Sequence, residues 1–342
     1  MSPKPLGVAV IGCGLIGRRR ARTVTAHPGS RLRVVVDADA ARAEEVAREH
    51  GCDIAPEWQA ALERKDVDTV VVSTPNHLLA EIGGAALASG RHVLLEKPMG
   101  RSYEEALAIA AAAARARDRG RILKLGFNHR YHPAIEGAYE LVAAGELGRV
   151  LNLRARYGHG SRPGCEAEWR ADPERAGGGE LTDQGVHIAD LFHWLAGPVE
   201  SAFGVLQTAF WRIEPLEDNA FGLFRFANGA VGQLHASMTQ WKNLFSLEVH
   251  GERGAVVVEG LGGSYGPERL TVVRRRPQGG VPDTTERAFP GEDGSWAAEW
   301  ADFVAATSSG EVTRGSAADG LAAMRMIDAL YRSARAGAPV PV

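Results

Sequence analysis

The first third of the chain alternates between short apolar runs and longer amphipathic segments. Residues 6–11 read LGVAVI, a nearly continuous apolar run of the kind that forms a strand buried on both faces of a parallel sheet. Residues 15–26 continue as a predicted helix, which the sequence His27-Pro28-Gly29 ends. We predict further strands at 32–36, 67–72, 92–95 and 122–127, and helices at 57–64, 77–89 and 103–119. This alternation predicts a doubly wound parallel α/β sheet that binds its ligand at the carboxyl ends of the strands.

The second half of the chain is dominated by strand-like segments that follow one another with few helices. The pair Asn228-Gly229 is a strong signal for a hairpin turn. The predicted helices are at 296–307 and 317–334. Strands are predicted at 150–157, 199–209, 220–226, 230–239, 244–250 and 255–258.

Length and composition indicate a soluble protein with two domains. A chain of 342 residues is longer than one hydrophobic core usually supports, so we expect domains at 1–127 and 128–342. Hydrophobic residues make up 45% of the chain, and no stretch approaches the roughly 20 apolar residues that span a bilayer. The start of the chain has no signal-peptide pattern, so we expect a cytoplasmic protein with no membrane partner.

Charge and cysteine content argue against two other classes of protein, namely nucleic-acid binders and proteins built on disulfides or cysteine-rich metal sites. The net charge of −3 gives no general attraction for polyanions, and the run Arg18-Arg19-Arg20 follows a glycine loop and does not form a basic tail. We therefore expect no nucleic-acid partner. Cys13, Cys52 and Cys165 are far apart and have no CxxC spacing, so they suggest neither a disulfide framework nor a cysteine-rich metal site.

A glycine-rich loop follows the first predicted strand. The residues Gly12-Cys13-Gly14-Leu15-Ile16-Gly17 form the pattern GxGxxG between a strand and a helix. In this context Gly12 permits a tight turn, Gly14 lets the backbone approach a pyrophosphate, and Gly17 lets the helix pack close to the strand. The helix N-terminus then presents free N–H groups and its positive dipole end to the phosphates. The loop predicts a dinucleotide site.

An acidic residue strengthens this prediction and indicates which dinucleotide binds. The second predicted strand ends at Asp37, 20 residues beyond Gly17, where a carboxylate would accept hydrogen bonds from the adenosine ribose. Its charge would repel a 2′-phosphate, and the following Ala38 offers no cation to hold one. We therefore expect the cofactor to be NAD and not NADP. The alternative is that Asp37 only caps the end of the strand.

Two later strand ends carry polar residues that would line the cofactor site. One is Ser73-Thr74-Pro75-Asn76-His77, and the other is Glu96-Lys97-Pro98. The Lys97 ammonium would project where a nicotinamide is expected, and there it could hydrogen-bond a substrate hydroxyl and lower its pKa. A solvated lysine at a strand end is the alternative. The sequence leaves open whether the Lys97-Pro98 bond is cis.

A second glycine run precedes a candidate acid–base pair. Residues 177–190 read GGGELTDQGVHIAD and pass from a glycine loop into a predicted helix that ends near 195–197. Asp183 and His187 are four residues apart and would share one face of that helix. A carboxylate beside an imidazole suits a base that takes a hydroxyl proton while hydride leaves the carbon. The alternatives are a structural pair or a metal site, and no third ligand is evident at metal-site spacing.

These three segments resemble the signatures of the Gfo/Idh/MocA oxidoreductases. The matching segments are Gly12 to Gly17, residues 89–98 (SGRHVLLEKP) and residues 177–190. The resemblance implies a Rossmann domain followed by an α/β domain with a large, open-faced, mostly antiparallel sheet. It also implies that Lys97, Asp183 and His187 are the catalytic residues. In that scheme His187 is the general base, Asp183 orients the substrate or His187, and Lys97 polarises the reacting hydroxyl.

Further polar and aromatic residues are candidates for binding. In proteins similar to this one, a Trp-Arg pair such as Trp169-Arg170 lies near the cofactor or the substrate. Trp241 could offer a face on which a sugar stacks, although a loop role is equally open. The remaining substrate candidates, each of which could equally be structural, are Asn128, Arg130, Tyr131, His159 and Arg162.

The sequence therefore predicts an NAD-dependent dehydrogenase that oxidises a secondary ring hydroxyl of a sugar or glycoside to a ketone. Nucleotide sugars and aminoglycoside precursors are among the candidate substrates. One alternative is an inositol dehydrogenase, and a second, from another class, is a non-catalytic NAD-binding regulator. A broad sheet with one uncovered face would need a partner, so we expect a homodimer or a homotetramer.

Overall fold

The computed structural model describes residues 4–342, which divide into two compact units. The first unit contains the residues up to Phe127 together with Trp296–Leu321, and the second contains Asn128–Ser295 and Ala322–Val342. This grouping differs from the division expected from the sequence, because it places Trp296–Leu321 with the N-terminal half.

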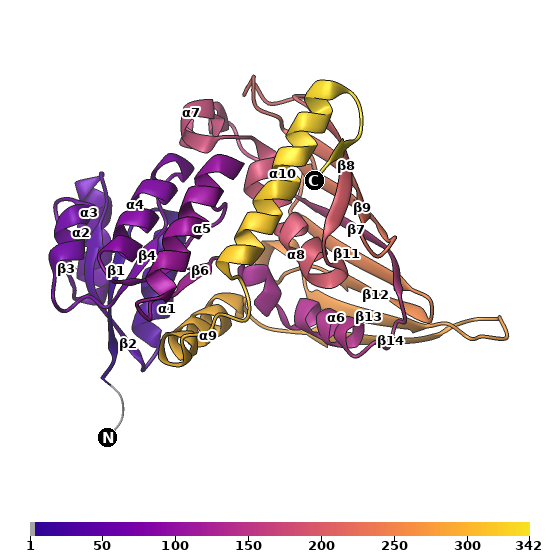
Figure 1. Ribbon diagram of the computed structural model, residues 1–342, viewed down its shortest axis with the longest axis horizontal. Helices are drawn as coiled ribbons and strands as arrows, with labels where there is room; N and C mark the ends of the chain where they lie inside the picture. Colours follow the sequence, from indigo (N-terminus) through magenta and orange to yellow (C-terminus); the bar gives the residue numbers. More distant parts are fainter. Residues whose placement is uncertain (1–3) are drawn as a thin grey trace. The chain divides into compact units, whose positions relative to one another are not determined.

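The first unit is built on a six-stranded parallel sheet in the order β3-β2-β1-β4-β5-β6. Its strands are β1 (Leu6–Ile11), β2 (Ser30–Val36), β3 (Asp53–Ile54), β4 (Thr69–Val72), β5 (His92–Leu95) and β6 (Leu123–Leu125). Its helices are α1 (Leu15–Ala26), α2 (Ala40–His50), α3 (Trp58–Glu63), α4 (Asn76–Ala88), α5 (Tyr103–Arg117) and α9 (Ser295–Ser309). The doubly wound parallel sheet is confirmed, whereas α2 and β3 were not predicted (Figure 1).

Helix α9 completes the hydrophobic core of the first unit. Its Trp300 and Phe303 are fully buried in one cluster with Val8, Val35 and Leu94 of the parallel sheet. The Trp300 indole N–H donates a hydrogen bond of 2.9 Å to the Ser30 hydroxyl at the start of β2. Two large aromatic side chains buried against the sheet explain why a segment so late in the sequence belongs to this unit.

The second unit is built on a nine-stranded sheet in the order β14-β13-β12-β11-β7-β10-β9-β8-β15. Only the pair β7 and β10 is parallel among these neighbours, so the mostly antiparallel sheet expected from the resemblance is confirmed. Strands β13 to β15 were not predicted. The strands are β7 (Val150–Gly158), β8 (Val199–Gln207), β9 (Asn219–Phe226), β10 (Val231–Ser237), β11 (Leu244–Gly251), β12 (Gly254–Glu259), β13 (Glu268–Arg274), β14 (Asp283–Phe289) and β15 (Val340–Pro341).

Helices cover one face of this sheet and leave the other open. They are α6 (Pro133–Ala143), α8 (Val186–Ala196) and α10 (Ala317–Ala336), which Figure 1 shows on the same side of the strands. Gly204 and Gly222 let α10 approach closely, because a Cβ atom at Gly204 would lie 2.6 Å from the Leu330 carbonyl oxygen. On the opposite face Val205 and Leu223 are 50% and 48% exposed. The predicted open face is therefore present.

Short elements complete the second unit. Helix α7 (Pro173–Ala176) leads to the second glycine run, and Gly229 adopts the positive φ of 84° that the predicted Asn228-Gly229 hairpin turn requires. Among residues 4–342, no helix combines the length and the apolar character needed to cross a membrane.

Candidate active site

Steric contacts explain the glycines of the first loop. Gly12 has a φ of +93°, and a Cβ atom there would lie 2.5 Å from the Ser73 carbonyl oxygen. A Cβ atom at Gly17 would clash with the Gly12 carbonyl oxygen, whereas one at Gly14 would meet nothing within 4 Å. Leu15, at the start of α1, is 79% exposed. The loop therefore has open space at the position where a dinucleotide pyrophosphate is expected to approach the backbone.

Asp37 is held beside this loop. One carboxylate oxygen accepts a hydrogen bond of 2.6 Å from the Cys13 backbone N–H, and the other accepts one of 2.8 Å from the Asp39 N–H. These are the contacts of a strand-end cap, and they also fix the carboxylate at the edge of the loop. Burial, together with the Asp37 charge, raises the pKa of the Cys13 thiol to about 12, so this thiol is un-ionised.

The residues after β4 also lie against the glycine loop. The Ser73 hydroxyl donates a hydrogen bond of 2.9 Å to the Gly12 carbonyl oxygen. Thr74 follows in the same turn, Pro75 precedes α4, and Asn76 and His77 form its first turn. The structure therefore brings together two of the segments predicted to bind the cofactor.

A buried ion network supports the strand end that carries Lys97. The preceding Glu96 carboxylate accepts a 2.6 Å hydrogen bond from the Arg20 guanidinium, which also donates to Glu299 at 2.5 Å. The Trp296 ring lies 4.4 Å from the same guanidinium. A Cβ atom at Gly126 would lie 2.8 Å from a Glu96 carboxylate oxygen, so this glycine makes room for the network. The Lys97-Pro98 bond, left open by the sequence, is cis.

The second glycine run packs against a buried glutamate. The Glu217 carboxylate accepts hydrogen bonds of 3.0 Å from the Leu181 N–H and 2.7 Å from the Tyr331 hydroxyl. A Cβ atom at Gly179 would clash with the Glu217 backbone, and one at Gly178 would clash with Tyr331. Burial raises the pKa of Glu217 and outweighs the hydrogen bonds that lower it.

The turn that carries Asp183 is not the regular α-helix that the sequence predicted. Leu181–Gly185 (η4) is π-helical, and α8 begins only at Val186. A π turn is wider than an α turn, and such turns are frequent at functional sites. The Asp183 carboxylate accepts a hydrogen bond of 3.0 Å from the Arg170 guanidinium. Arg170 therefore lies directly beside Asp183, the carboxylate of the candidate acid–base pair.

His187 is buried in an aromatic environment. Its ring stacks on that of His129 with centroids 3.9 Å apart, and the Tyr157 ring is 6.0 Å away. Tyr157 shares a hydrogen bond with Tyr265, and burial raises the pKa of both, to about 12 for Tyr265. The Tyr157 ring is therefore a neutral neighbour of His187.

Several substrate candidates have buried structural partners. The Arg130 guanidinium forms a two-point ion pair with Asp190 at 2.8 and 2.6 Å, with both side chains 1% exposed. The Asn128 amide donates to the Ser295 hydroxyl at 2.9 Å. Tyr131 is also buried. These contacts favour the structural alternative for the three residues.

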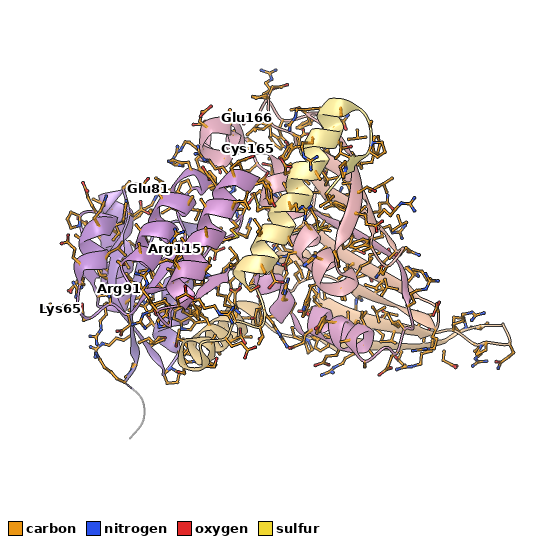
Figure 2. The ribbon with its side chains drawn as sticks, viewed as in Figure 1. Lys65, Glu81, Arg91, Arg115, Cys165 and Glu166 are labelled. Atoms are coloured by element: carbon orange, nitrogen blue, oxygen red, sulfur yellow. The ribbon has the colours of Figure 1, made fainter. Side chains whose placement is uncertain are left out.

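The other candidates lie on loops of the second unit. A His159 ring nitrogen lies 3.7 Å from a Glu180 carboxylate oxygen, and Arg162 forms an ion pair with Glu168. Trp169 packs against a small cluster that contains the buried Cys165. Figure 2 labels Cys165 and Glu166, which lie on the segment before α7. Trp241 is 63% exposed.

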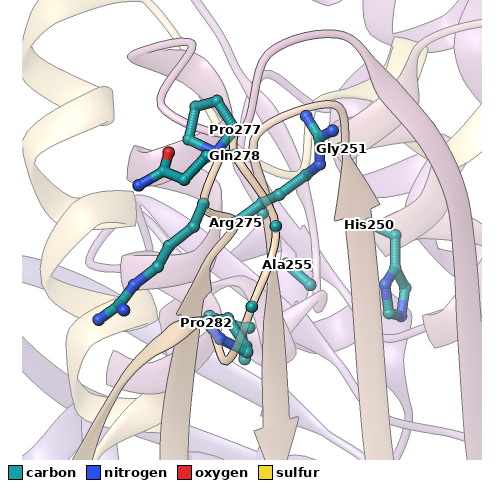
Figure 3. A pocket seen from close by; sticks show the side chains of 12 residues that line it. His250, Gly251, Ala255, Arg275, Pro277, Gln278 and Pro282 are labelled. Carbon is teal, nitrogen blue, oxygen red and sulfur yellow. The ribbon is translucent and has the colours of Figure 1, made fainter.

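A cavity of about 630 Å³ lies elsewhere in the second unit, between the β11–β12 turn and the β13–β14 hairpin. His250, Arg275 and Gln278 are among the residues that line it (Figure 3). It contains none of the residues singled out by the sequence, and its open walls are hairpin turns. We therefore do not assign it to the candidate active site. Within residues 4–342, no cluster of three or more His, Cys, Asp or Glu side chains is arranged to hold a metal ion.

Sequence reasoning missed several residues that shape the site. Arg20 was noted only as part of the run Arg18-Arg19-Arg20, and nothing marked Glu217, Tyr157 or His129. Tyr265 had a signal, because it lies in the distinctive segment GLGGSYG. The glycines at 178 and 179 were a second signal, since their missing side chains indicate a close approach by another segment.

Two family models match the chain. One, described as an oxidoreductase family with an NAD-binding Rossmann fold, matches residues 6–125. The other, described as the GFO/IDH/MocA C-terminal domain, matches residues 135–257.

Four named relatives and solved structures are similar over most of the chain. A levoglucosan dehydrogenase of Pseudarthrobacter phenanthrenivorans is 30% identical over 289 residues, which cover 74% of this chain and 73% of the relative. A solved levoglucosan dehydrogenase with NADH has a TM-score of 0.89 at 27% identity, covering 99% of both chains. Inositol 2-dehydrogenase 2 of Saccharopolyspora erythraea is 28% identical, and the match covers 98% of this chain and 95% of the relative. GenD2 from gentamicin A biosynthesis, solved with NAD, has a TM-score of 0.85 at 29% identity, covering 100% of this chain and 97% of its own.

Replacing Asp37 and its neighbour should change the dinucleotide preference. The double variant Asp37→Ala, Ala38→Arg removes the charge that repels a 2′-phosphate and adds a cation that attracts it. We expect the ratio of NADP to NAD affinity, measured by fluorescence titration, to rise at least about tenfold, a change of roughly 1.4 kcal/mol. Asp37→Asn is the matched control and should gain little NADP affinity, because it supplies no cation. An unchanged preference in the double variant would remove Asp37 from the ribose site.

The buried network behind Lys97 should make stability depend on pH. Burial raises the pKa of Glu299 from 4.5 to about 6 and outweighs the opposing effect of Arg20. The folded state therefore holds this proton more tightly, and the resulting stability is present below pH 4.5 and lost as the pH rises through 6. We expect Glu299→Gln to remove a fall of about 2 kcal/mol in the free energy of unfolding across this window, measured by urea titration. The exposed control Glu63→Gln should keep the wild-type slope, and an equal slope in all three proteins would contradict the assignment.

Proposed function

This chain belongs to the Gfo/Idh/MocA oxidoreductase family, whose first domain is an NAD-binding Rossmann fold, and on that premise we propose that it oxidises a secondary ring hydroxyl of a sugar or glycoside to a ketone. The observation that supports the proposal best is the Asp183–His187 segment. It combines a carboxylate beside Arg170, a buried imidazole, and a π-helical turn fixed by Glu217.

The proposed reaction consists of a hydride transfer and a proton transfer. Bound NAD would accept the hydride from the carbinol carbon, and the glycine loop with Asp37 fits that cofactor because open space lies at Gly14. His187 takes the hydroxyl proton as general base. Asp183 orients the substrate or His187, and Lys97 donates a hydrogen bond to the reacting oxygen, which lowers the pKa of the hydroxyl. The reaction balances as one hydride and one proton lost from the alcohol.

The named relatives support the substrate class. Two are named for levoglucosan and inositol, both of which are polyhydroxylated rings, and GenD2 belongs to gentamicin A biosynthesis. Nucleotide sugars and aminoglycoside precursors stay candidates, and inositol oxidation is the second candidate function, favoured by the inositol 2-dehydrogenase relative. The third alternative, a non-catalytic NAD-binding regulator, is disfavoured because the sequence has all three of Lys97, Asp183 and His187, which a pure sensor would not need.

A substrate panel tests the proposal. The pure protein is incubated with NAD and with inositols, free sugars, sugar phosphates, nucleotide sugars and amino-sugar glycosides, and NADH formation is followed by absorbance. We expect NADH with at least one class of sugar or glycoside. Turnover of free inositols alone would establish the second candidate. No turnover with any class, although NADH binds, would contradict both enzymatic candidates and favour the regulator.

Loss of Lys97 should stop turnover and spare cofactor binding. A positioned general acid or base typically contributes about 10²–10⁴-fold to the rate. We expect kcat of Lys97→Ala to fall by at least about 10²-fold, with the NADH dissociation constant within about twofold of wild type. The matched control is the exposed Lys65→Ala, labelled in Figure 2, which should keep wild-type kcat. A Lys97→Ala protein that retains most of the wild-type kcat would contradict the assignment of Lys97 as a catalytic residue.

We also propose that the open face of the nine-stranded sheet joins copies of this chain into a homodimer or a homotetramer. Val205, Phe221, Leu223 and Val231 are between 41% and 50% exposed on this face. An apolar patch of this kind on a sheet usually marks an interface. Light scattering should give twice or four times the chain mass, and Leu223→Glu should lower the measured mass. A monomeric wild type would contradict the proposal.

The cytoplasmic location stays a prediction from the sequence.

A further inference from the structure

Two large aromatic side chains form an exposed corner on neighbouring loops of the second unit. Phe210 is 60% exposed and Trp241 is 63% exposed. Their ring centroids are 4.9 Å apart at an angle of 81°, so each ring supports the other edge to face. We refer to this pair as the aromatic corner. Its rings are held against each other while both remain accessible.

A buried carboxylate fixes the Phe210 side of the corner. Asp218 is fully buried and accepts backbone hydrogen bonds from Ala209, Phe210 and Trp211 at 2.8, 2.7 and 3.0 Å. Burial would raise the pKa of Asp218, but these N–H donors outweigh it and hold the pKa below its ordinary value. A buried charge with three aligned donors fixes the backbone at the exposed Phe210.

The Trp241 side is fixed by its backbone. Trp241 has a φ of +55°, which is rare for a bulky residue and persists only where the surroundings enforce it. The preceding Gln240 donates a 3.2 Å hydrogen bond to the His159 carbonyl oxygen, and Asn243 donates one of 2.6 Å to the Ser264 hydroxyl. A Cβ atom at Gly160 would lie 3.2 Å from the Trp241 Cα atom. The indole is therefore presented by a defined turn.

Contacts within the second unit tie the corner to the turn that carries Asp183. Asp218, which holds Phe210, follows Glu217, which holds the Leu181 N–H. Trp211, whose ring contacts Phe210, packs in one cluster with Cys165 and Trp169.

The adjacent loops make the same connection. Arg170 bonds to Asp183, and His159, whose carbonyl accepts from the Trp241 turn, lies 3.7 Å from Glu180. The segments that hold the aromatic corner in place therefore also contact the turn that carries Asp183.

We propose that the aromatic corner is an outer subsite that binds the second ring of a two-ring glycoside. The inference rests on the proposed function, in which the reacting ring lies at His187. That imidazole is only 4% exposed, whereas the corner is open to solvent, so the corner suits a ring that stays partly in water. The C–H bonds of a sugar ring, or the face of an aryl ring, pack against such aromatic faces. The preferred substrate is then a glycoside whose aglycone is itself a ring.

Binding to matched probes tests the subsite without requiring turnover. The NADH-loaded protein is titrated by calorimetry with methyl and phenyl β-glucosides, β-galactosides and β-mannosides, and with methyl β-cellobioside. We expect at least one two-ring probe to bind about tenfold more tightly than its methyl partner, as for one ring stacked on an aromatic side chain. Trp241→Ala and Phe210→Ala should each remove most of that gain and leave methyl glycoside binding unchanged. Val281→Ala, which trims an exposed apolar residue of the β13–β14 hairpin, is the control and should retain it.

The outcomes separate the two proposals. Equal affinity for every one-ring and two-ring pair, binding of no probe, or an equal loss for both probe types in Trp241→Ala would overturn the subsite. If the pairs behave as expected while no sugar in the turnover panel reduces NAD, the oxidation proposal fails and the subsite remains. If glycosides are oxidised but kcat/KM is indifferent to the second ring and to Trp241→Ala, only the subsite fails.

Discussion

The buried carboxylate of Glu217 is the contact on which the proposed acid–base site depends. A carboxylate that is removed from water needs donors, because burial without hydrogen bonds costs several kcal/mol. Here the donors are the Leu181 N–H and the Tyr331 hydroxyl. The backbone that leads to Asp183 is therefore held in place by the side chain of a residue 36 positions later in the chain. The two glycines at 178 and 179 follow from the same contact, since any side chain there would occupy the space of Tyr331 or Glu217.

In the first unit, buried carboxylates that accept hydrogen bonds likewise lie behind a strand end, that of β5. Arg20 is fully buried between Glu96 and Glu299, and its guanidinium donates a hydrogen bond to each carboxylate. Glu96 directly precedes Lys97, so the ion network fixes the end of β5 from behind. Truncating one partner of such a network leaves a buried charge unpaired and is usually far more damaging than losing a surface ion pair. A buried carboxylate that accepts hydrogen bonds therefore lies next to each segment of proposed catalytic residues.

The elements predicted most accurately are those whose signal is local. The predicted bounds of β1, α1 and β5 coincide with the observed ones, because a buried parallel strand reads as a continuous apolar run and Pro28 and the glycines mark the helix ends. Strand β14 was missed because DTTERAF has no apolar alternation, and almost every residue in it is exposed. Helix α9 was predicted as a helix, but its place in the first unit depends on contacts between Trp300 and residues some 270 positions earlier.

The site was predictable to the same extent. The GxGxxG loop and Asp37 were found from local turns and a fixed strand–helix spacing, and in the structure the Asp37 carboxylate accepts a hydrogen bond from the loop. The π-helical turn at 181–185 was not predicted, because it is imposed by Glu217 and Tyr331, which are distant in sequence. Arg130 looked like a substrate ligand because an arginine at a strand exit resembles one, and only the fold reveals its partner Asp190.

Isotope transfer tests the central claim, that hydride moves directly from a ring carbon to the nicotinamide. The substrate found in the panel is prepared with deuterium at the carbon that becomes the ketone, and the NADH formed is analysed by NMR. The account predicts one deuterium at C4 of the nicotinamide for each ketone produced, together with a slower turnover than with the unlabelled compound. NADH that carries no deuterium, with the label released to water, would contradict it.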